Sequence, residues 1–332
     1  MIFGKDLTSE IQSALRGEGV FAVTDANVAR LYPELFTPGR TFVLEPGEAR
    51  KNLDSVSEIC AFLNASGADR QSKLIAVGGG VVGDTAGFAA SIYMRGIAWA
   101  LVPTTLLALC DSSVGGKTGV NFKNLKNILG TFHFPEQVYL SAHFIKTLPE
   151  REFLCGIGEA LKTACLSKEI FDFVLQNEKA VFLRDGRALE RLIRLCAEFK
   201  NDIVTRDPRE KTGLRKILNY GHTVGHAIET ADNQRLSHGE YILHGMRIEN
   251  RMAGDIVNPA FFAESERLFT AALSGKKLKF DVAAAAEAAA SDKKNADGKI
   301  SFIAVIEPGA HKEIFFTKKM FERKLKEISD GF

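Results

Sequence analysis

The sequence has little that would place it in a membrane, outside the cell or on nucleic acid. It contains no run of eighteen apolar residues, so we expect no membrane span. Its first residues, MIFGKDLTSEIQ, lack the basic and apolar stretches of a secretory signal. The formal net charge is only +2, which gives no electrostatic reason to expect nucleic acid or an anionic membrane as a partner.

Cysteine is also sparse. The five cysteines are odd in number, scattered, and form no C-x-x-C pair. This distribution argues against a disulfide framework or a zinc knuckle and favours reduced thiols, so we expect a cytoplasmic protein. The 332 residues exceed one ordinary core, which predicts two domains.

The first part of the chain alternates short apolar runs with helical patterns. Five runs are rich in β-branched or aromatic residues and end in turn residues, as buried parallel strands do. These runs are residues 19–25, 40–46, 73–80, 98–105 and 137–143. Residues 55–67 carry apolar side chains at helical spacing and end at a glycine, which predicts a crossover helix.

Beyond residue 150 the pattern becomes mainly helical. Apolar residues recur at helical spacing in segments 153–166, 170–176, 188–204 and 261–274, and the alanine-rich stretch 283–290 also favours a helix. A late strand is expected over residues 299–309, as a small edge element. The sequence therefore predicts an α/β N-terminal dinucleotide-binding domain (1–150) and a mainly α-helical C-terminal metal- and substrate-binding domain (151–332). The substrate cleft is expected between the two.

A glycine run follows the third candidate strand. Gly78, Gly80 and Gly83 have the spacing G-x-G-x-x-G and precede a helical pattern. Glycines there let backbone N–H groups approach a pyrophosphate, and a helix N-terminus favours its charge. Taken alone, the run is equally well explained as a flexible strand-to-helix turn.

A second loop imitates a nucleotide-binding motif without completing it. Residues 111–118, DSSVGGKT, look like a Walker A loop, but Asp111 stands where that motif has its first glycine. The kinase or ATPase interpretation therefore loses its main support. Lys117 remains a candidate for contacting an anion, with an exposed loop lysine as the alternative.

Histidines form a third group. His222 and His226 are four residues apart and share one helical face, and His238 follows at a later turn. Two or three histidines with a carboxylate suit Zn²⁺ or Co²⁺ and leave a position open for substrate. Glu159, in the apparent helix start GIGEALK, is the candidate carboxylate. A structural histidine pair and an ordinary helix-face glutamate are the alternatives.

Together these motifs resemble the 3-dehydroquinate synthase family. The matching blocks run in the family's order from about Asp25 to Ile300. They are GGGVVGDTAGFAAS, YMRGI, VPTTLLALCDSSVGGKTGVN, LKNILGTF, LPEREFLCGIGEALK, GLRKILNYGHTVGHAIE, LSHGEYILHGM and SDKKNADGKI. One departure concerns the family's D-G-E-x-Y-K block, which here reads PGEARK over residues 46–51 and lacks the aromatic residue.

The resemblance implies an enzyme that converts DAHP (3-deoxy-D-arabino-heptulosonate 7-phosphate) to 3-dehydroquinate and phosphate. The implied cofactors are NAD and a divalent metal, Zn or Co, and the implied assembly is a homodimer. The implied metal ligands are Glu159, His222 and His238. The implied NAD contacts are Asp25, Asn27, Glu48, Lys51, Gly80, Val81, Val82, Gly83, Asp84, Thr104, Thr105, Lys117, Lys126, Phe144, Ile145, Lys146 and Thr147. The implied catalytic and substrate-binding residues are Arg95, Asp111, Lys117, Lys126, Asn127, Lys162, Lys200, Arg215, Asn219, His226 and one of Lys293 and Lys294.

Three alternatives remain. A metal-dependent polyol dehydrogenase would release NADH and needs no phosphate pocket, so the basic residues in these motifs argue against it. A related cyclase could act on another sugar phosphate, although Arg215, Asn219 and His226 favour a carboxylated substrate. A catalytically inactive binding protein would have a broken metal triad, whereas all three ligands are present.

Overall fold

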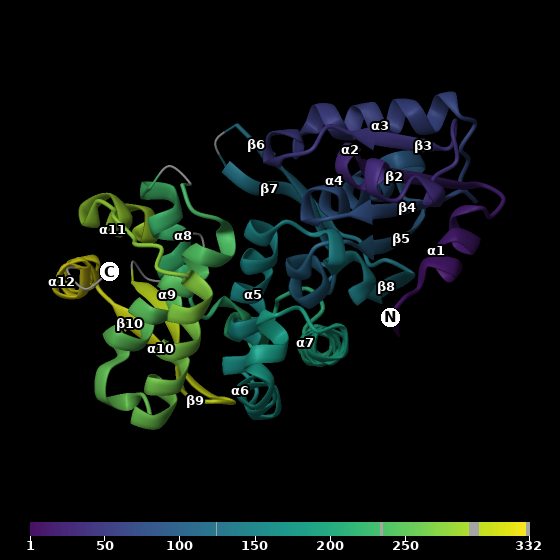
Figure 1. The fold of residues 1–332 in the computed structure, drawn as a ribbon. Helices are drawn as coiled ribbons and strands as arrows, with labels where there is room; N and C mark the ends of the chain where they lie inside the picture. Colours follow the sequence, from purple (N-terminus) through teal and green to yellow (C-terminus); the bar gives the residue numbers. More distant parts are fainter. Residues whose placement is uncertain (124, 233–234, 292–298, 330–332) are drawn as a thin grey trace. The chain divides into compact units, whose positions relative to one another are not determined.

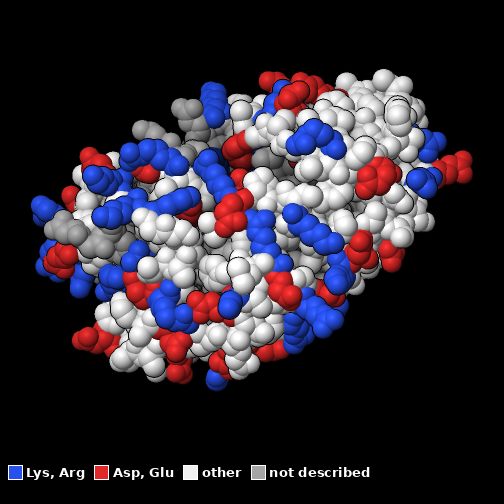
Figure 2. Space-filling view, in the orientation of Figure 1, with Lys and Arg blue, Asp and Glu red and all other residues white. Residues whose placement is uncertain are grey.

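The chain forms two compact units. The computed structural model describes residues 1–123, 125–232, 235–291 and 299–329. The first unit comprises Met1–Pro149 and Ala180–Ala197, and the second comprises Glu150–Lys179 and Glu198–Phe332. No helix in the described ranges is long and apolar enough to cross a membrane. Lys and Arg are interspersed with Asp and Glu on the face shown in Figure 2.

Residues 180–197 belong to the first unit, whereas the sequence boundary at residue 150 assigns them to the second domain. Two contacts explain the difference. The Arg184 guanidinium donates to the carbonyl of Leu148 at 2.6 Å, and the Arg194 guanidinium lies 4.3 Å from the centre of the Phe3 ring. Both contacts bind this returning segment to the first unit, and a helical pattern in the sequence carries no information about them.

The first unit contains a six-stranded parallel sheet with the order β1-β8-β5-β4-β2-β3 (Figure 1). Its strands are β1 (Ile2–Gly4), β2 (Val20–Asp25), β3 (Thr41–Leu44), β4 (Lys73–Gly78), β5 (Ala98–Pro103) and β8 (Gln137–Ser141). All five strands expected from the sequence are present, and β1 is an addition at the edge. The α/β character of this part is confirmed.

Helices connect the strands. They are α1 (Thr8–Leu15), α2 (Ala26–Leu31), α3 (Leu53–Ala65) and α4 (Gly80–Ile92). The expected crossover helix is α3, which begins where the Asn52 side chain accepts a hydrogen bond from the Ser55 N–H at 2.9 Å. Its buried residues include Val56, Ile59 and Leu63, which lie on one helical face.

An antiparallel hairpin was not expected from the sequence. Strands β6 (Lys117–Phe122) and β7 (Leu125–Phe132) pair outside the main sheet. Gly119 and Gly130 lie opposite each other, and a Cβ atom on Gly130 would lie only 2.1 Å from the carbonyl oxygen of Thr118. The two glycines therefore permit this pairing, although glycine is unusual in strands.

The second unit is mainly helical, as expected. Its helices are α5 (Glu150–Cys165), α6 (Lys168–Phe182), α7 (Gly186–Arg206), α8 (His222–Ala231), α9 (His238–Ala253), α10 (Pro259–Leu273), α11 (Val282–Ala290) and α12 (Lys318–Ser329), with α6 and α7 shared with the first unit. The late strand is β9 (Ile300–Glu307), which pairs antiparallel with β10 (Ala310–Phe316). Buried residues of α8, α9, α11, β9 and α12 form one apolar core.

Glycines bring α5, α8 and α9 into backbone contact. A Cβ atom on Gly239 of α9 would lie 2.0 Å from the carbonyl oxygen of Cys155 in α5. A Cβ atom on Gly245 of α9 would lie 2.0 Å from the carbonyl oxygen of Gly221, which directly precedes α8. Because real Cβ atoms do not approach so closely, only glycine allows α9 to pack against both neighbours at this distance.

Candidate metal centre and cofactor site

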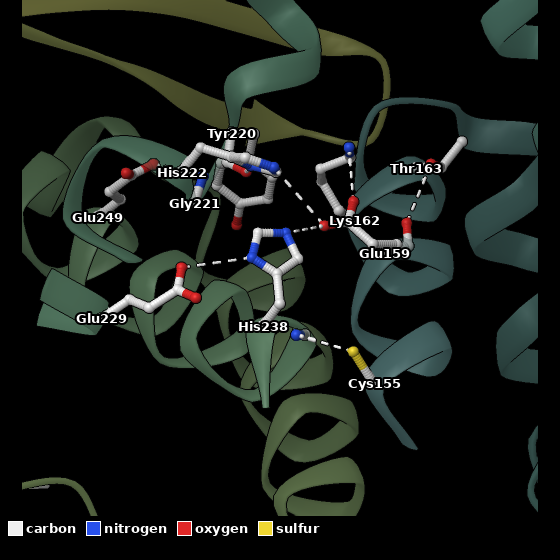
Figure 3. Close-up of polar contacts among 11 residues, drawn as sticks. Cys155, Glu159, Lys162, Thr163, Tyr220, Gly221, His222, Glu229, His238 and Glu249 are labelled. Carbon is white, nitrogen blue, oxygen red and sulfur yellow. Dashed lines mark hydrogen bonds and ion pairs between the residues drawn. The ribbon is translucent and has the colours of Figure 1, made fainter. Parts of the chain in front are cut away.

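Three candidate ligands from three helices meet in the second unit (Figure 3). The Nε2 atom of His238 lies 3.1 Å from Oε1 of Glu159, and Nε2 of His222 lies 3.6 Å from the same oxygen. His222 and His238 are the first residues of α8 and α9, whereas Glu159 lies in the middle of α5. The sequence interpretation of GIGEALK as a helix start is therefore wrong, because α5 already begins at Glu150.

Glu159 is almost completely buried, with 1% of its surface exposed. Burial alone would raise the pKa of its carboxyl group, but the Lys162 ammonium, 2.7 Å away, and the rings of His222 and His238 hold that pKa well below its usual range. Burial alone would lower the pKa of the His238 ring, but its hydrogen bonds with Glu159 and Glu229 raise that pKa to about 9. The Lys162 ammonium therefore favours the ionised form of the buried Glu159 carboxylate.

His226 also reaches this cluster. The ligand-capable atoms of His222, His226 and His238 all lie within 4.8 Å of one another. The His226 ring centre is 5.0 Å from that of His222 and 5.4 Å from that of His238. The arrangement suits a divalent cation with nitrogen and oxygen ligands. Because four side chains converge, the ligand set of Glu159, His222 and His238 stays a prediction.

Cys155 lies beside the cluster. Its Sγ atom accepts a hydrogen bond from the Gly239 N–H at 3.3 Å, and burial raises the pKa of its thiol to about 12. This hydrogen bond joins α5 to α9.

We expect Cys155 to resist alkylation in the native protein. At pH 8 a thiol with this pKa is ionised in roughly one molecule in 10⁴, and only the thiolate reacts. Peptide mapping after treatment with iodoacetamide should find Cys155 unmodified before unfolding and modified after it. The partly exposed Cys60 serves as the comparison. Faster labelling of Cys155 than of Cys60 would contradict this expectation.

Several other predicted anion-binding residues lie in the same unit. Lys162, Lys200 and Arg215 are cationic yet buried. Arg215 and Asn219 belong to the turn Leu214–Asn219, and the Arg215 guanidinium donates to the carbonyl of Pro208 at 3.2 Å. Buried cations are uncommon unless they are compensated, and here Glu159 pairs with Lys162 at 2.7 Å and Glu210 lies 3.3 Å from Arg215. Lys293 and Lys294 lie outside the described residues.

Several of the predicted NAD residues lie at one edge of the parallel sheet, whereas Lys117 and Lys126 lie on the β6–β7 hairpin. Asp25 ends β2, Gly80 follows β4, and Thr104 follows β5, while residues 144–147 follow β8. The register pairs Gly78 with Pro103 and Val77 with Thr24, so these carboxyl ends are level. Ligands of open α/β sheets bind outside the carboxyl ends of the strands.

The strand-to-helix turn at the glycine run opens onto a small cavity. Its lining includes Gly79, Gly80, Gly83, Asp84 and Lys117. A Cβ atom on Gly80 would meet nothing nearer than Oγ of Ser112 at 3.6 Å, which leaves space in front of the first turn of α4. This first turn, which includes Val81 and Val82, presents backbone N–H groups that suit a pyrophosphate.

Three acidic groups near this edge have partners within the chain. The Asp84 carboxylate forms an ion pair of 2.6 Å with the buried Lys51, and the Glu48 carboxylate accepts a hydrogen bond from the Asn121 side chain at 2.8 Å. The Asp25 carboxylate accepts from the N–H groups of Asn27 and Val28 and so begins α2. These contacts fix the loops that follow the strands.

The segment after β8 has two buried and two exposed residues among those predicted to contact NAD. Phe144 and Ile145 are buried, and the Phe144 ring packs 5.0 Å from that of Tyr32. Lys146 and Thr147 are exposed, and the Thr147 hydroxyl is 2.7 Å from the Tyr32 hydroxyl. After β5, the Thr105 hydroxyl accepts from the N–H of Ala108 at 3.2 Å.

The remaining predicted substrate residues of the first unit lie on turns and on the hairpin. Arg95 has a positive φ of 73° in the turn Tyr93–Arg95, and Asp111 lies in the helical turn Ala108–Ser112. Lys126 and Asn127 are exposed on β7, where the Asn127 N–H donates to the Asn121 side chain at 2.9 Å.

The sequence analysis missed three residues that hold the histidines. The Glu229 carboxylate lies 3.4 Å from Nδ1 of His238, the carbonyl of Tyr220 lies 3.1 Å from Nδ1 of His222, and the Glu249 carboxylate accepts from the N–H of Gly221 (Figure 3). A single glutamate in a helical pattern resembles a surface charge, so the sequence offers no sign of its burial.

Two family models match the chain. The model described as 3-dehydroquinate synthase N-terminal covers residues 41–155, and the one described as 3-dehydroquinate synthase C-terminal covers residues 156–295. The chain belongs to the 3-dehydroquinate synthase family. A 3-dehydroquinate synthase of Alkaliphilus metalliredigens is 39% identical over 326 residues, which are 95% of this chain and 91% of that protein. The resemblance stated from the motifs is therefore confirmed, and the chain is an enzyme of the 3-dehydroquinate synthase type by family.

Two solved structures are similar in fold. A 2-epi-5-epi-valiolone synthase from Streptomyces hygroscopicus, with NAD⁺ and Zn²⁺ bound, is 26% identical with a TM-score of 0.85 and covers 94% of this chain and 91% of its own. A 2-deoxy-scyllo-inosose synthase, complexed with carbaglucose-6-phosphate, NAD⁺ and Co²⁺, is 25% identical with a TM-score of 0.84 and covers 98% and 96%. The family fold thus occurs in related cyclases.

Proposed function

We propose that this member of the 3-dehydroquinate synthase family converts DAHP to 3-dehydroquinate and phosphate with NAD and one Zn²⁺ or Co²⁺ ion. The reaction is a carbon–oxygen lyase reaction that proceeds by transient oxidation, phosphate elimination, re-reduction and intramolecular aldol closure. The observation that carries the proposal is the convergence of Glu159, His222 and His238 beside the buried Lys162. A site with one carboxylate, several imidazoles and an adjacent cation suits a metal-chelated, anionic substrate.

The donor atoms fit a divalent metal, and we assign Glu159, His222 and His238 as its ligands. The ion would polarise the oxygen of the substrate alcohol that is oxidised to a ketone and later reduced. NAD would accept the hydride and return it, so that it acts as a catalytic cofactor. The residues proposed to hold NAD are those at the carboxyl edge of the sheet, with the first turn of α4 as the pyrophosphate site.

The basic side chains are proposed to bind the two anionic groups of the substrate. Charge-assisted hydrogen bonds from Lys and Arg are stronger than neutral ones and offset the cost of removing a phosphate from water. His226 is proposed to relay a proton or to bind the phosphate, since its ring is 5.0 Å from that of His222. No side chain is assigned as the base of the elimination, because the substrate phosphate is itself basic.

Each remaining alternative would leave a distinct mark. A polyol dehydrogenase would release NADH, and a related cyclase would prefer a substrate without a carboxylate. Arg215 is buried, and the motif that contains it favours a substrate with a carboxylate, which supports DAHP over substrates without one. The 39% identity to a 3-dehydroquinate synthase, against 26% and 25% to the other cyclases, also supports it.

We also propose a cytoplasmic homodimer. Large apolar side chains are exposed on and beside the β6–β7 hairpin: Phe122, Leu125, Phe132 and Phe134. Contiguous exposed apolar residues often mark a protein interface. Light scattering of the purified protein would give the mass of the assembly, and a monomer at micromolar concentration would contradict the proposal.

The decisive experiment offers DAHP to the purified protein with limiting NAD and excess Zn²⁺. We expect phosphate release to exceed the amount of NAD many times over, without NADH absorbance rising in step. Accumulation of NADH in proportion to product would instead identify a dehydrogenase. Glucose 6-phosphate, which has no carboxylate, is the comparison substrate and should release no phosphate.

Metal removal should abolish this activity. Treatment with a chelator is expected to remove phosphate release, and added Zn²⁺ or Co²⁺ is expected to restore it, because the ligands are side chains of a folded site. Elemental analysis before and after treatment provides the control. Full turnover by a preparation free of metal would contradict the assignment of the centre.

A further inference from the structure

Helices α8 and α9 each carry a candidate ligand at their first residue. They are His222 in α8 and His238 in α9. The two helices run antiparallel, because Glu249 near the end of α9 contacts the start of α8, and Glu229 near the end of α8 contacts the start of α9. Each helix thus supplies one ligand and one carboxylate that reaches the ligand-bearing end of the other.

The contact from α9 to α8 is a buried cap. Glu249 has 0% of its surface exposed, and its carboxylate accepts from the N–H of Gly221 at 2.6 Å and from the N–H of Val224 at 3.1 Å. Free N–H groups at a helix start need acceptors, and a carboxylate there also favours the helix dipole. The residue between these two N–H groups that faces the cluster is His222.

The same turn also orients the His222 ring. Nδ1 of His222 lies 3.1 Å from the carbonyl of Tyr220, and the Tyr220 hydroxyl donates to the Asn250 side chain at 2.8 Å. Donation from Nδ1 to this carbonyl leaves Nε2 as the atom that faces Glu159. Two neighbouring residues of α9 therefore hold the turn that orients the His222 ring. Asn250 binds Tyr220, and Glu249 binds Gly221 and Val224.

The contact from α8 to α9 is directed at the ring itself. Oε2 of Glu229 lies 3.4 Å from Nδ1 of His238, and Nε2 of that ring lies 3.1 Å from Glu159 (Figure 3). Glu229 has only 8% of its surface exposed. A carboxylate on the outer nitrogen of a ligating histidine fixes its tautomer and raises its basicity, which strengthens metal binding.

We propose that Glu249 and Glu229 are positioning residues of the metal centre, in which each of the paired helices α8 and α9 holds the histidine of the other. The inference rests on the metal site of the proposed function. Neither glutamate touches the ion in this arrangement. Glu249 acts through the turn at residues 220–224, and Glu229 acts through the His238 ring.

The test measures Co²⁺ binding by the full chain, by chelator competition and by the visible absorption bands of the bound ion. Glu249→Gln keeps the size of the side chain but replaces one acceptor oxygen by an amide group that faces a backbone N–H. Glu229→Ala removes the partner of His238 and leaves the Glu249 cap of α8 intact, and Glu229→Gln restores an acceptor without charge. Glu266→Gln is the matched control, since the Glu266 carboxylate pairs with Arg247 and Arg251 of α9.

We expect Glu249→Gln and Glu229→Ala each to weaken Co²⁺ binding by about 10–100-fold and to shift the absorption bands, with Glu229→Gln intermediate. Glu266→Gln should bind Co²⁺ as the unmodified chain does, even if its thermal stability falls. Unchanged Co²⁺ affinity in both Glu249→Gln and Glu229→Ala would overturn the proposal, as would an equal loss in Glu266→Gln. If Glu249→Gln does not fold, the Glu229 series decides alone.

These measurements distinguish a failure of the positioning roles from a failure of the proposed function. If the unmodified chain binds Co²⁺ but does not release phosphate from DAHP, the reaction is wrong and the positioning roles can still be measured. If the unmodified chain binds no Co²⁺, the metal site and with it this inference are both overturned.

Discussion

Replacing His222 by alanine is expected to weaken Zn²⁺ or Co²⁺ binding severely. Loss of a residue that only supports a metal ligand typically weakens metal binding by about 10–100-fold, and the loss of a ligand itself should exceed this. His222 is an assigned ligand whose Nε2 lies 3.6 Å from Oε1 of Glu159. Turnover should fall with metal content and should return in part at high metal concentration. Metal stoichiometry of the purified variant, together with phosphate release, measures both effects.

Replacing His226 by alanine is expected to leave the metal in place and to lower turnover by about 10²–10⁴-fold, as the loss of general acid–base help does. His311→Ala, an exposed histidine of β10, is the control and should change neither quantity. If His226→Ala loses the metal as completely as His222→Ala, the ligand set is wrong. The three histidines lie within 4.8 Å of one another, which is why this comparison is decisive.

Replacing Gly239 by alanine is expected to destabilise the second unit and to weaken metal binding together. The new Cβ atom would lie 2.0 Å from a backbone carbonyl of α5, so α9 must move away from α5. Forced overpacking costs about 1–3 kcal/mol, which corresponds to about 2–4 °C of melting temperature for each kcal/mol. The same shift separates His238 from Glu159, which lie 3.1 Å apart.

Gly186→Ala is the matched control for this substitution. Gly186 begins α7, and a Cβ atom there would meet nothing nearer than the Lys5 side chain at 3.9 Å. Alanine should therefore be neutral or stabilise the chain by up to about 1 kcal/mol through helix propensity. Melting curves and Co²⁺ titration of both variants separate crowding from the simple loss of a glycine. An unchanged Gly239→Ala protein would contradict the backbone contact.

The sequence predicts the parallel sheet well because its strands are continuous apolar runs. The runs at 73–80 and 98–105 became β4 and β5, both buried. β1 has only three residues, which is too short for a pattern to appear. The β6–β7 hairpin was missed because it contains Gly119 and Gly130 and its burial follows no regular alternation along either strand.

The site was predicted in part. The spacing of His222 and His226 correctly implied one helical face, and the structure brings His238 and Glu159, both candidates from the sequence, to the same cluster. Glu229 and Glu249 could not be found in this way. Their importance depends on burial against another helix, and burial of a single carboxylate in a polar helical pattern follows from tertiary packing rather than from local sequence.

The ion pair between Lys162 and Glu159 bears on the order in which the protein folds and acquires its metal. Because the Lys162 ammonium lies 2.7 Å from the buried carboxylate, the chain itself supplies the counter-charge that a buried anion requires. A small zinc finger has no such internal substitute and remains unfolded until the ion arrives. Here the polypeptide can fold first and bind the cation afterwards. The folded protein, rather than the unfolded chain, then selects among the available metals.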